Sequence, residues 1–91
     1  MIYKLDFSKD AEKIAKKWKK SNKPLFEKLR KILNSIVETP RDGIGHPEAM
    51  KGGNNITYSR HITAHDRIIY NVLDDIITVA VIEIEGHYND K

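Results

Sequence analysis

The hydrophobic positions of this 91-residue chain change their period twice. In Ile2–Phe7, apolar and polar side chains alternate, which predicts a short, half-buried strand. From Ser8 to Pro40 the apolar positions recur every three or four residues, and the break at Ser21–Asn22 divides this region into two predicted helices. A strand-like pattern returns in three later stretches: Ile56–Thr63, Arg67–Leu73 and Ile76–Ile84.

The ends of the two predicted helices carry recognisable signals. Ser8 is a predicted N-cap, and acidic residues follow it in the first turn, where the helix dipole favours them. Pro24 is tolerated in the first turn of the second helix, and Pro40 ends that helix. The short connection at Ser21–Asn22 predicts an antiparallel helical hairpin.

The last three strands are separated by tight turns at Ala64–Asp66 and Asp74–Asp75, which predict an antiparallel meander. Ile76–Ile84 is apolar enough to predict a central strand that is buried on both faces. We expect the first strand to join this sheet and the helical hairpin to cover one of its faces. The predicted fold is therefore α+β, with the order β-α-α-β-β-β, an antiparallel sheet and a single domain over residues 1–91.

The amino-acid composition excludes several classes of protein. The chain is 40% hydrophobic and 32% charged, as in globular proteins, and has no cysteine, which excludes disulfides and thiolate chemistry. It has no apolar run of membrane-spanning length and no signal-peptide segment, so we expect no membrane contact. The absence of cysteine leads us to expect a cytoplasmic location.

Positive charge is concentrated in the first part of the chain. Residues 1–40 hold 11 Lys and Arg against 5 Asp and Glu, whereas residues 41–91 hold 5 against 8. This distribution favours a polyanionic partner, and equally an exposed helix face that the lysines only solvate. Four lysines of the first helix are candidates for RNA binding: Lys13, Lys16, Lys17 and Lys20.

Side chains suited to acid–base chemistry fall in a loop and near strand ends. The loop Gly45–Lys51 is rich in turn formers, and we expect it to be ordered but to contain no helix or strand. Because the start of one antiparallel strand lies beside the end of the next, polar groups at these places can meet on one rim of the sheet. The candidates are Glu48, Lys51, Arg67, His87 and Tyr88.

This set suits metal-independent RNA cleavage, in which a base removes the 2′-OH proton, cations stabilise the phosphorane and an acid protonates the leaving oxygen. Glu48 is the candidate base and His87 the candidate acid. Arg67 and Lys51 would stabilise the phosphorane, and Tyr88 would orient the phosphate or stack on a base.

Simpler interpretations of the same residues stay open. Glu48 can be a surface acid and His87 a solvated residue. Arg67 can pair with Asp66, Glu83 or Glu85. The four histidines match no standard ligand spacing, so we expect neither a metal nor a cofactor.

Four segments of the chain carry distinctive motifs: IGHPEAMK, YSRHI, HDRIIY and GHYNDK. They resemble, in this order, the G-x-G-K-P-E-x-L-K, W/Y-S-R-R-I, E-H-R-L-V-Y and terminal H-Y segments of the Txe/YoeB toxins of the RelE-like superfamily. The resemblance implies the toxin of a type II toxin–antitoxin module, a ribosome-dependent endoribonuclease that cuts mRNA in the decoding site. The family's catalytic residues fall on the five candidates named above, and its strand arginine, an RNA-binding candidate, falls on Arg60.

The resemblance also implies partners. These are the ribosome with its mRNA and a cognate YefM/Axe-like antitoxin with an acidic segment. The family includes homodimers, and operator DNA is expected to be bound only through the antitoxin complex.

Two positions depart from the family pattern. His46 replaces a lysine and His61 replaces an arginine, at positions that we expect to contact RNA. Imidazole lacks the bidentate phosphate grip of arginine, so reduced or re-tuned cleavage is expected. Two alternatives remain: a catalytically weakened homologue that still binds antitoxin, ribosome or operator, and a non-specific basic binder of nucleic acids.

Overall fold

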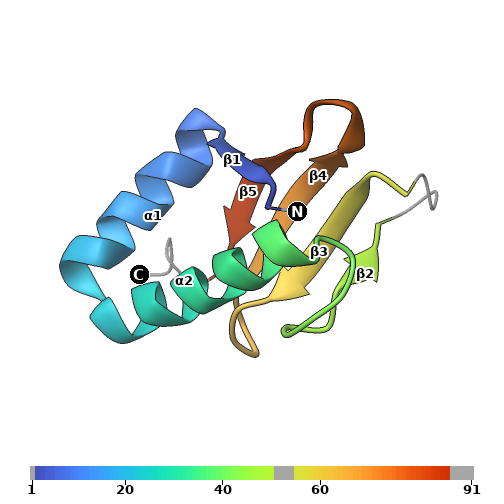
Figure 1. The fold of residues 1–91 in the computed structure, drawn as a ribbon. Helices are drawn as coiled ribbons and strands as arrows, with labels where there is room; N and C mark the ends of the chain where they lie inside the picture. The colour runs from blue at the N-terminus through green and yellow to red at the C-terminus, as the bar shows by residue number, and fades with distance from the viewer. Residues whose placement is uncertain (1, 51–54, 87–91) are drawn as a thin grey trace.

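The computed structural model describes residues 2–50 and 55–86, which form a five-stranded sheet and two helices (Figure 1). The α+β class and the order of the long elements predicted from the sequence are confirmed. The elements in chain order are β1 (Lys4–Phe7), α1 (Lys9–Ser21), α2 (Lys23–Glu38), β2 (Glu48–Ala49), β3 (Thr57–His61), β4 (Arg67–Leu73), the 3₁₀ turn η1 (Asp74–Ile76) and β5 (Thr78–Glu85).

The sheet is mixed rather than antiparallel, which corrects the prediction. Its strand order is β1-β5-β4-β3-β2, and β1 runs parallel to β5 while the other three pairs are antiparallel. A parallel neighbour needs a long connection, whereas a tight turn forces an antiparallel one. Because β1 leads into two helices rather than a hairpin turn, no local constraint made it antiparallel.

Part of the predicted loop Gly45–Lys51 is in fact a strand. Glu48 and Ala49 form β2, which pairs with Ser59 and Tyr58 of β3. The pairing continues in a hydrogen bond of 2.8 Å from the Met50 amide to the Thr57 carbonyl. A two-residue strand is too short to give an alternating pattern, which explains why the sequence analysis missed it.

The helical hairpin forms as predicted and covers one face of the sheet (Figure 1). The Ser8 hydroxyl caps α1 by accepting from the Ala11 amide at 3.0 Å, and the Asn22 side chain caps α2. The apolar stripes of both helices supply half of one continuous core. Its buried helix residues are Ala11, Trp18, Leu25, Leu29, Ile32 and Ile36.

The prediction that the last strand is buried on both faces was wrong. β5 lies between β1 and β4, but only one of its faces enters the core, and Ile82 is 40% exposed. Val81 pairs with Tyr70 and Glu83 pairs with Ile69, so Ile82 is an extra residue at a β-bulge. The bulge moves the following odd-numbered residues of β5 onto the face that the helices leave uncovered, which we call the open face.

Candidate functional site

The strand register brings the predicted base and the strand arginine to the same face. One row of paired residues crosses β2, β3, β4 and β5 and consists of Glu48, Ser59, Ile69 and Glu83. The next row on the same face crosses β3, β4 and β5 and consists of His61, Arg67 and Glu85. Side chains directly opposite one another point to the same face of a sheet, and the core residues of β3 and β4 have the other parity. Glu48, His61 and Arg67 therefore stand in adjacent rows of the open face.

Arg67 is engaged by a carboxylate but remains accessible. Its Nε donates to Glu85 Oε1 at 2.8 Å, and the two side chains are 42% and 37% exposed. This is one of the pairings that the sequence left open. An exposed pair of this kind is worth about 0–1 kcal/mol, so a phosphate group can compete for Arg67.

Acidic charge also gathers on this part of β5. Burial and the nearby Glu85 charge raise the pKa of Glu83. Any RNA phosphate that approaches Arg67 therefore meets two carboxylates as well as a guanidinium. Glu48 itself is exposed, and within residues 2–50 and 55–86 it forms no ion pair.

The two histidines that depart from the family pattern lie together beside this face. The His61 amide donates to the Gly45 carbonyl at 2.7 Å, which holds the preceding segment against the end of β3. His46, with φ of 52°, places its ring 6.5 Å from that of His61, centre to centre, in an edge-on arrangement. Both imidazoles are exposed. The two positions at which the family pattern has a lysine and an arginine therefore lie side by side on the surface, and both carry histidine.

Arg60 contradicts its predicted role in RNA binding. It is only 1% exposed and lies on the core side of β3, where five protein oxygens accept hydrogen bonds from its guanidinium. Its parity with Tyr58 and Ile62, both buried, was the sequence signal for this burial. A guanidinium whose donors are all occupied within the protein cannot bind a phosphate.

The other predicted residues divide into two groups. Lys13, Lys16, Lys17 and Lys20 are exposed on α1, and Lys16 lies 3.5 Å from Glu12. Their role in RNA binding stays a prediction. Lys51, His87 and Tyr88 lie outside the described residues. In sequence, His87 follows Glu85, the partner of Arg67, by two positions.

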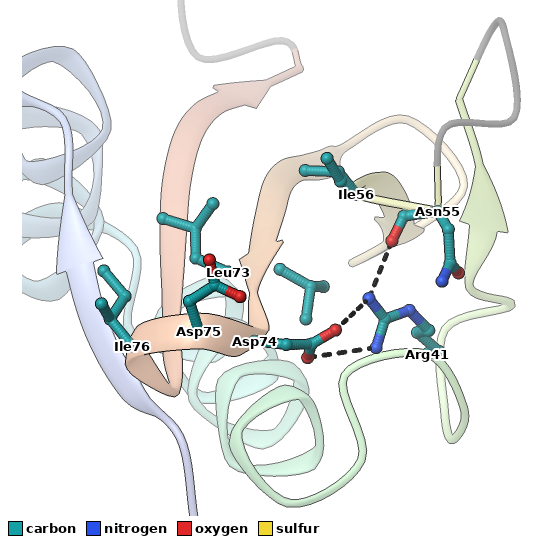
Figure 2. A pocket seen from close by; sticks show the side chains of 8 residues that line it. Arg41, Asn55, Ile56, Leu73, Asp74, Asp75 and Ile76 are labelled. Atoms are coloured by element: carbon teal, nitrogen blue, oxygen red, sulfur yellow. Dashed lines mark hydrogen bonds and ion pairs between the residues drawn. The ribbon is translucent and has the colours of Figure 1, made fainter.

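A second polar cluster, which the sequence analysis missed, lies at the other end of β4 (Figure 2). We call it the Arg41 clasp, formed by Tyr3, Arg41, Asn55 and Asp74. Arg41 donates to the Asn55 carbonyl at 2.7 Å and to Asp74 Oδ2 at 3.0 Å, and the Tyr3 hydroxyl donates to Asp74 Oδ1 at 2.7 Å. These contacts join the residue before β1, the α2–β2 connection, the segment just before β3 and η1.

The clasp borders a cavity of about 370 Å³ with an apolar lining that includes Ile56, Leu73 and Ile76 (Figure 2). The hydrogen bonds from Arg41 and Tyr3 lower the pKa of Asp74. Arg41 also lies over the Tyr58 ring, 5.7 Å from its centre. Because its charges are matched within the protein, the clasp has the character of a structural clamp.

Neither a metal centre nor a membrane segment emerges from the described part of the chain. It contains no group of three or more His, Asp or Glu side chains arranged to hold a metal ion. It also contains no helix that is long and apolar enough to cross a membrane.

Comparison with known proteins extends this picture. The YoeB toxin of Escherichia coli O6:H1 is 33% identical over 63 residues, which are 69% of this chain and 75% of the relative. The solved dimer of Staphylococcus aureus YoeB matches with a TM-score of 0.81 and 28% identity, covering 97% of this chain and all of that one. In the YoeB–YefM complex of the same organism, the toxin matches with a TM-score of 0.80, 29% identity and the same coverage. The family model for YoeB-like toxins matches residues 7–88. This chain therefore belongs to the YoeB-like toxins of bacterial type II toxin–antitoxin systems.

Proposed function

We propose that this toxin is a ribosome-dependent mRNA endonuclease that cleaves RNA without a metal ion. The observation that carries the proposal is the strand register, which puts Glu48 of β2 and Arg67 of β4 in adjacent rows of the open face, with β3 between the two strands. A carboxylate and a guanidinium so arranged can serve a proton transfer and the charge that develops on the phosphate.

In the proposed reaction, Glu48 accepts the proton of a ribose 2′-OH, and the 2′-oxygen attacks the adjacent phosphorus. Arg67 and Lys51 stabilise the negative charge on the phosphorane. The bond from phosphorus to the 5′-oxygen then breaks, and His87 protonates that oxygen while Tyr88 orients the phosphate. The products are a 2′,3′-cyclic phosphate and a 5′-hydroxyl end.

The exposure of Glu48 is compatible with this role. Bound RNA would exclude water from this carboxylate and so make it a better proton acceptor, because desolvation disfavours the charged form. The ribosome would supply both the mRNA and the surface that orders it. The exposed lysines of α1 would then bind the ribosomal RNA rather than take part in the chemistry.

We also propose that a YefM-like antitoxin with an acidic segment neutralises this toxin, as the solved YoeB–YefM complex from S. aureus suggests. The S. aureus YoeB dimer likewise supports a homodimer. Operator DNA would be bound only through the toxin–antitoxin complex, and the site of action is the cytoplasm.

Induced expression in bacteria tests the proposal. The wild-type chain should arrest growth and shorten ribosome-bound mRNA, and Glu48→Gln, Arg67→Ala and His87→Ala should each relieve the arrest. Circular dichroism and thermal unfolding would verify that each variant is folded. If the folded Glu48→Gln and Arg67→Ala variants still cleave as the wild type does, the proposed roles are wrong.

One alternative has specific support. His46 and His61 stand where the family pattern has permanent cations, and Arg67 already pairs with Glu85. These features favour a catalytically weakened toxin that acts by binding antitoxin, ribosome or operator complex. Growth and intact mRNA at high expression, together with measurable ribosome binding, would support this alternative.

A further inference from the structure

Arg60 is enclosed by protein oxygens that come from two distant parts of the chain. Its Nε donates to the Tyr70 hydroxyl at 3.0 Å and its Nη1 to the Ser35 hydroxyl at 2.7 Å. Nη1 also donates to the Ile44 carbonyl at 3.1 Å, and Nη2 donates to two further carbonyls at 2.6 Å each. Those two carbonyls belong to Thr39 and Asp42. All five guanidinium N–H groups are therefore used, and we call this arrangement the Arg60 cage.

None of the five acceptors is a carboxylate. Three are main-chain carbonyls of residues 39–44, directly after α2, and Thr39 is the C-cap of that helix. The C-terminal end of a helix carries partial negative charge, which stabilises a cation placed there. Tyr70 extends the same contact, since its hydroxyl donates to the Pro40 carbonyl at 2.6 Å. The buried charge is thus balanced by the segment that it holds.

Residues 39–45 are packed tightly around the guanidinium. A β-carbon at Gly43 would lie 2.3 Å from Ser35 Oγ and 3.1 Å from Arg60 Nη1. At Gly45, with φ of +84°, it would lie 2.7 Å from the His61 carbonyl oxygen and 2.8 Å from Ile32 Cδ1. Glycine at these two positions therefore allows the segment to lie close against Ser35, Arg60 and β3.

The cage leads directly to the proposed base. Arg60 binds the Ile44 carbonyl, and the amide of His61 binds the next carbonyl, that of Gly45. The short link to Glu48 then consists of His46 in a left-handed conformation and Pro47, whose ring fixes φ. We expect this short link to pass a shift of residues 44–45 on to Glu48.

We propose that Arg60 is a positioning residue, which sets the place of Glu48 relative to Arg67 through its hold on residues 39–45. This inference rests on the proposed function, because it gives the position of Glu48 a catalytic consequence. Arg60 touches no RNA in this account, and its effect on catalysis passes through the main chain.

The test compares Arg60→Lys, which keeps the charge but loses the planar fork, with Val79→Ala as a control. Val79 is fully buried in the core on β5 and is absent from the cage, so its truncation lowers stability without touching residues 39–45. Gly45→Ala is a second variant, which displaces the segment while leaving Arg60 intact. All are compared in the full chain well below their melting temperatures.

The first measurement is amide hydrogen exchange, which does not depend on cleavage. The His61 and Met50 amides bond to the Gly45 and Thr57 carbonyls, while the Val72 amide bonds to the Ile56 carbonyl away from the cage. In Arg60→Lys and Gly45→Ala, protection should fall at His61 and Met50 far more than at Val72. In Val79→Ala, protection should fall most at Val72, which lies directly opposite Val79, and not preferentially at His61 and Met50. A uniform loss in Arg60→Lys would overturn the proposal.

The second measurement is single-turnover cleavage of ribosome-bound mRNA. Arg60→Lys should lower the rate per folded molecule about 10- to 100-fold, since a displacement near 1 Å can cost that much. Ribosome affinity should stay within about twofold, because Arg60 lies outside the RNA contacts. An unchanged rate would also overturn the proposal. If the wild type itself does not cleave, the proposed function fails, and amide exchange alone decides whether Arg60 positions Glu48.

Discussion

The two ends of β4 carry the same kinds of side chain in opposite states. At its start, Arg67 forms an exposed ion pair with Glu85 and lies opposite the exposed His61. The exposed Glu48 stands in the adjacent row, two strands away on β2. Beyond its end, Arg41 is held by Asp74 and by the Asn55 carbonyl, and Tyr3 completes the clasp. One end keeps charged groups available to an outside ligand, whereas the other uses them to tie four segments together.

This difference shows how to separate functional from structural arginines in this fold. Among the residues that the structure describes, Arg60 has five protein acceptors and is buried, Arg41 has two acceptor residues and is partly covered, and Arg67 has one. The fewer acceptors the protein supplies, the more of the guanidinium is left for a phosphate. Arg67 is thus the arginine of the three that is best placed to bind RNA.

The largest expected effect is at the Arg67 end. Arg67→Ala should lower single-turnover mRNA cleavage by about 10²- to 10³-fold, the usual loss on removal of one charge-stabilising donor. The free energy of unfolding should change by less than about 1 kcal/mol, because the ion pair with Glu85 is exposed. Rapid-quench cleavage and urea unfolding measure the two quantities. A large loss of stability with normal cleavage would show that Arg67 is a structural arginine and not a functional one.

The second-largest effect should appear at the Arg41 end of β4, and it should change stability rather than cleavage. Arg41→Ala should lower the free energy of unfolding by on the order of 1 kcal/mol, through lost charged hydrogen bonds and lost packing on Tyr58. Cleavage per folded molecule should be unchanged, because Arg60 still binds the carbonyls of Thr39, Asp42 and Ile44 when the Arg41 side chain is removed. Urea unfolding gives the first value. Impaired cleavage by a fully folded variant would show that the clasp takes part in function.

A third substitution tests whether the histidine beside Arg67 limits cleavage. His61→Arg restores the permanent cation of the family pattern beside Arg67, and should raise cleavage by about three- to tenfold through stronger phosphate binding. The comparison uses ribosome-programmed mRNA at pH 7, with His65→Arg as a control at an exposed position of the β3–β4 turn. Equal or lower activity in the His61 variant would show that the imidazole is not a weakness.

The smallest effect concerns pH. The Arg41 and Tyr3 hydrogen bonds lower the pKa of Asp74 below its ordinary value of 3.8. Since the folded state binds this proton less readily than the unfolded state, the clasp stabilises the protein above that ordinary pKa. The contribution is lost as pH falls through the lower, folded-state pKa. Asp74→Asn should therefore have a flatter decline of melting temperature below pH 4 than the wild type, and parallel curves would contradict this assignment.

Much of this fold could be predicted because its signals are local. The cap at Ser8, the break at Ser21–Asn22 and the apolar stripes of both helices depend on neighbouring residues, and the structure matches them. The burial of Arg60 was also available from its parity with Tyr58 and Ile62. The interpretation of Arg60 as an RNA contact failed because the resemblance was given more weight than the period of the strand.

The remaining features depend on contacts between distant residues. The Ile76–Ile84 stretch is apolar at nearly every position, so no alternation marked the bulge at Ile82. The Arg41 clasp joins residues 33 positions apart and has no motif. At the candidate site, the sequence placed Glu48 and Arg67 on one rim, but only the register could put them in adjacent rows.

The central claim is that the open face carries a 2′-OH-dependent cleavage site with Glu48 as its base. The most direct measurement is cleavage of a ribosome-bound mRNA with a single 2′-deoxynucleotide on the 5′ side of the scissile phosphate. We expect the wild-type toxin to cut the all-ribose mRNA, leaving a 2′,3′-cyclic phosphate, and to leave the deoxy-substituted mRNA intact at that position. The Glu48→Gln toxin should cut neither. Cleavage of the deoxy-substituted bond by the wild type, or wild-type rates with Glu48→Gln, would contradict the account.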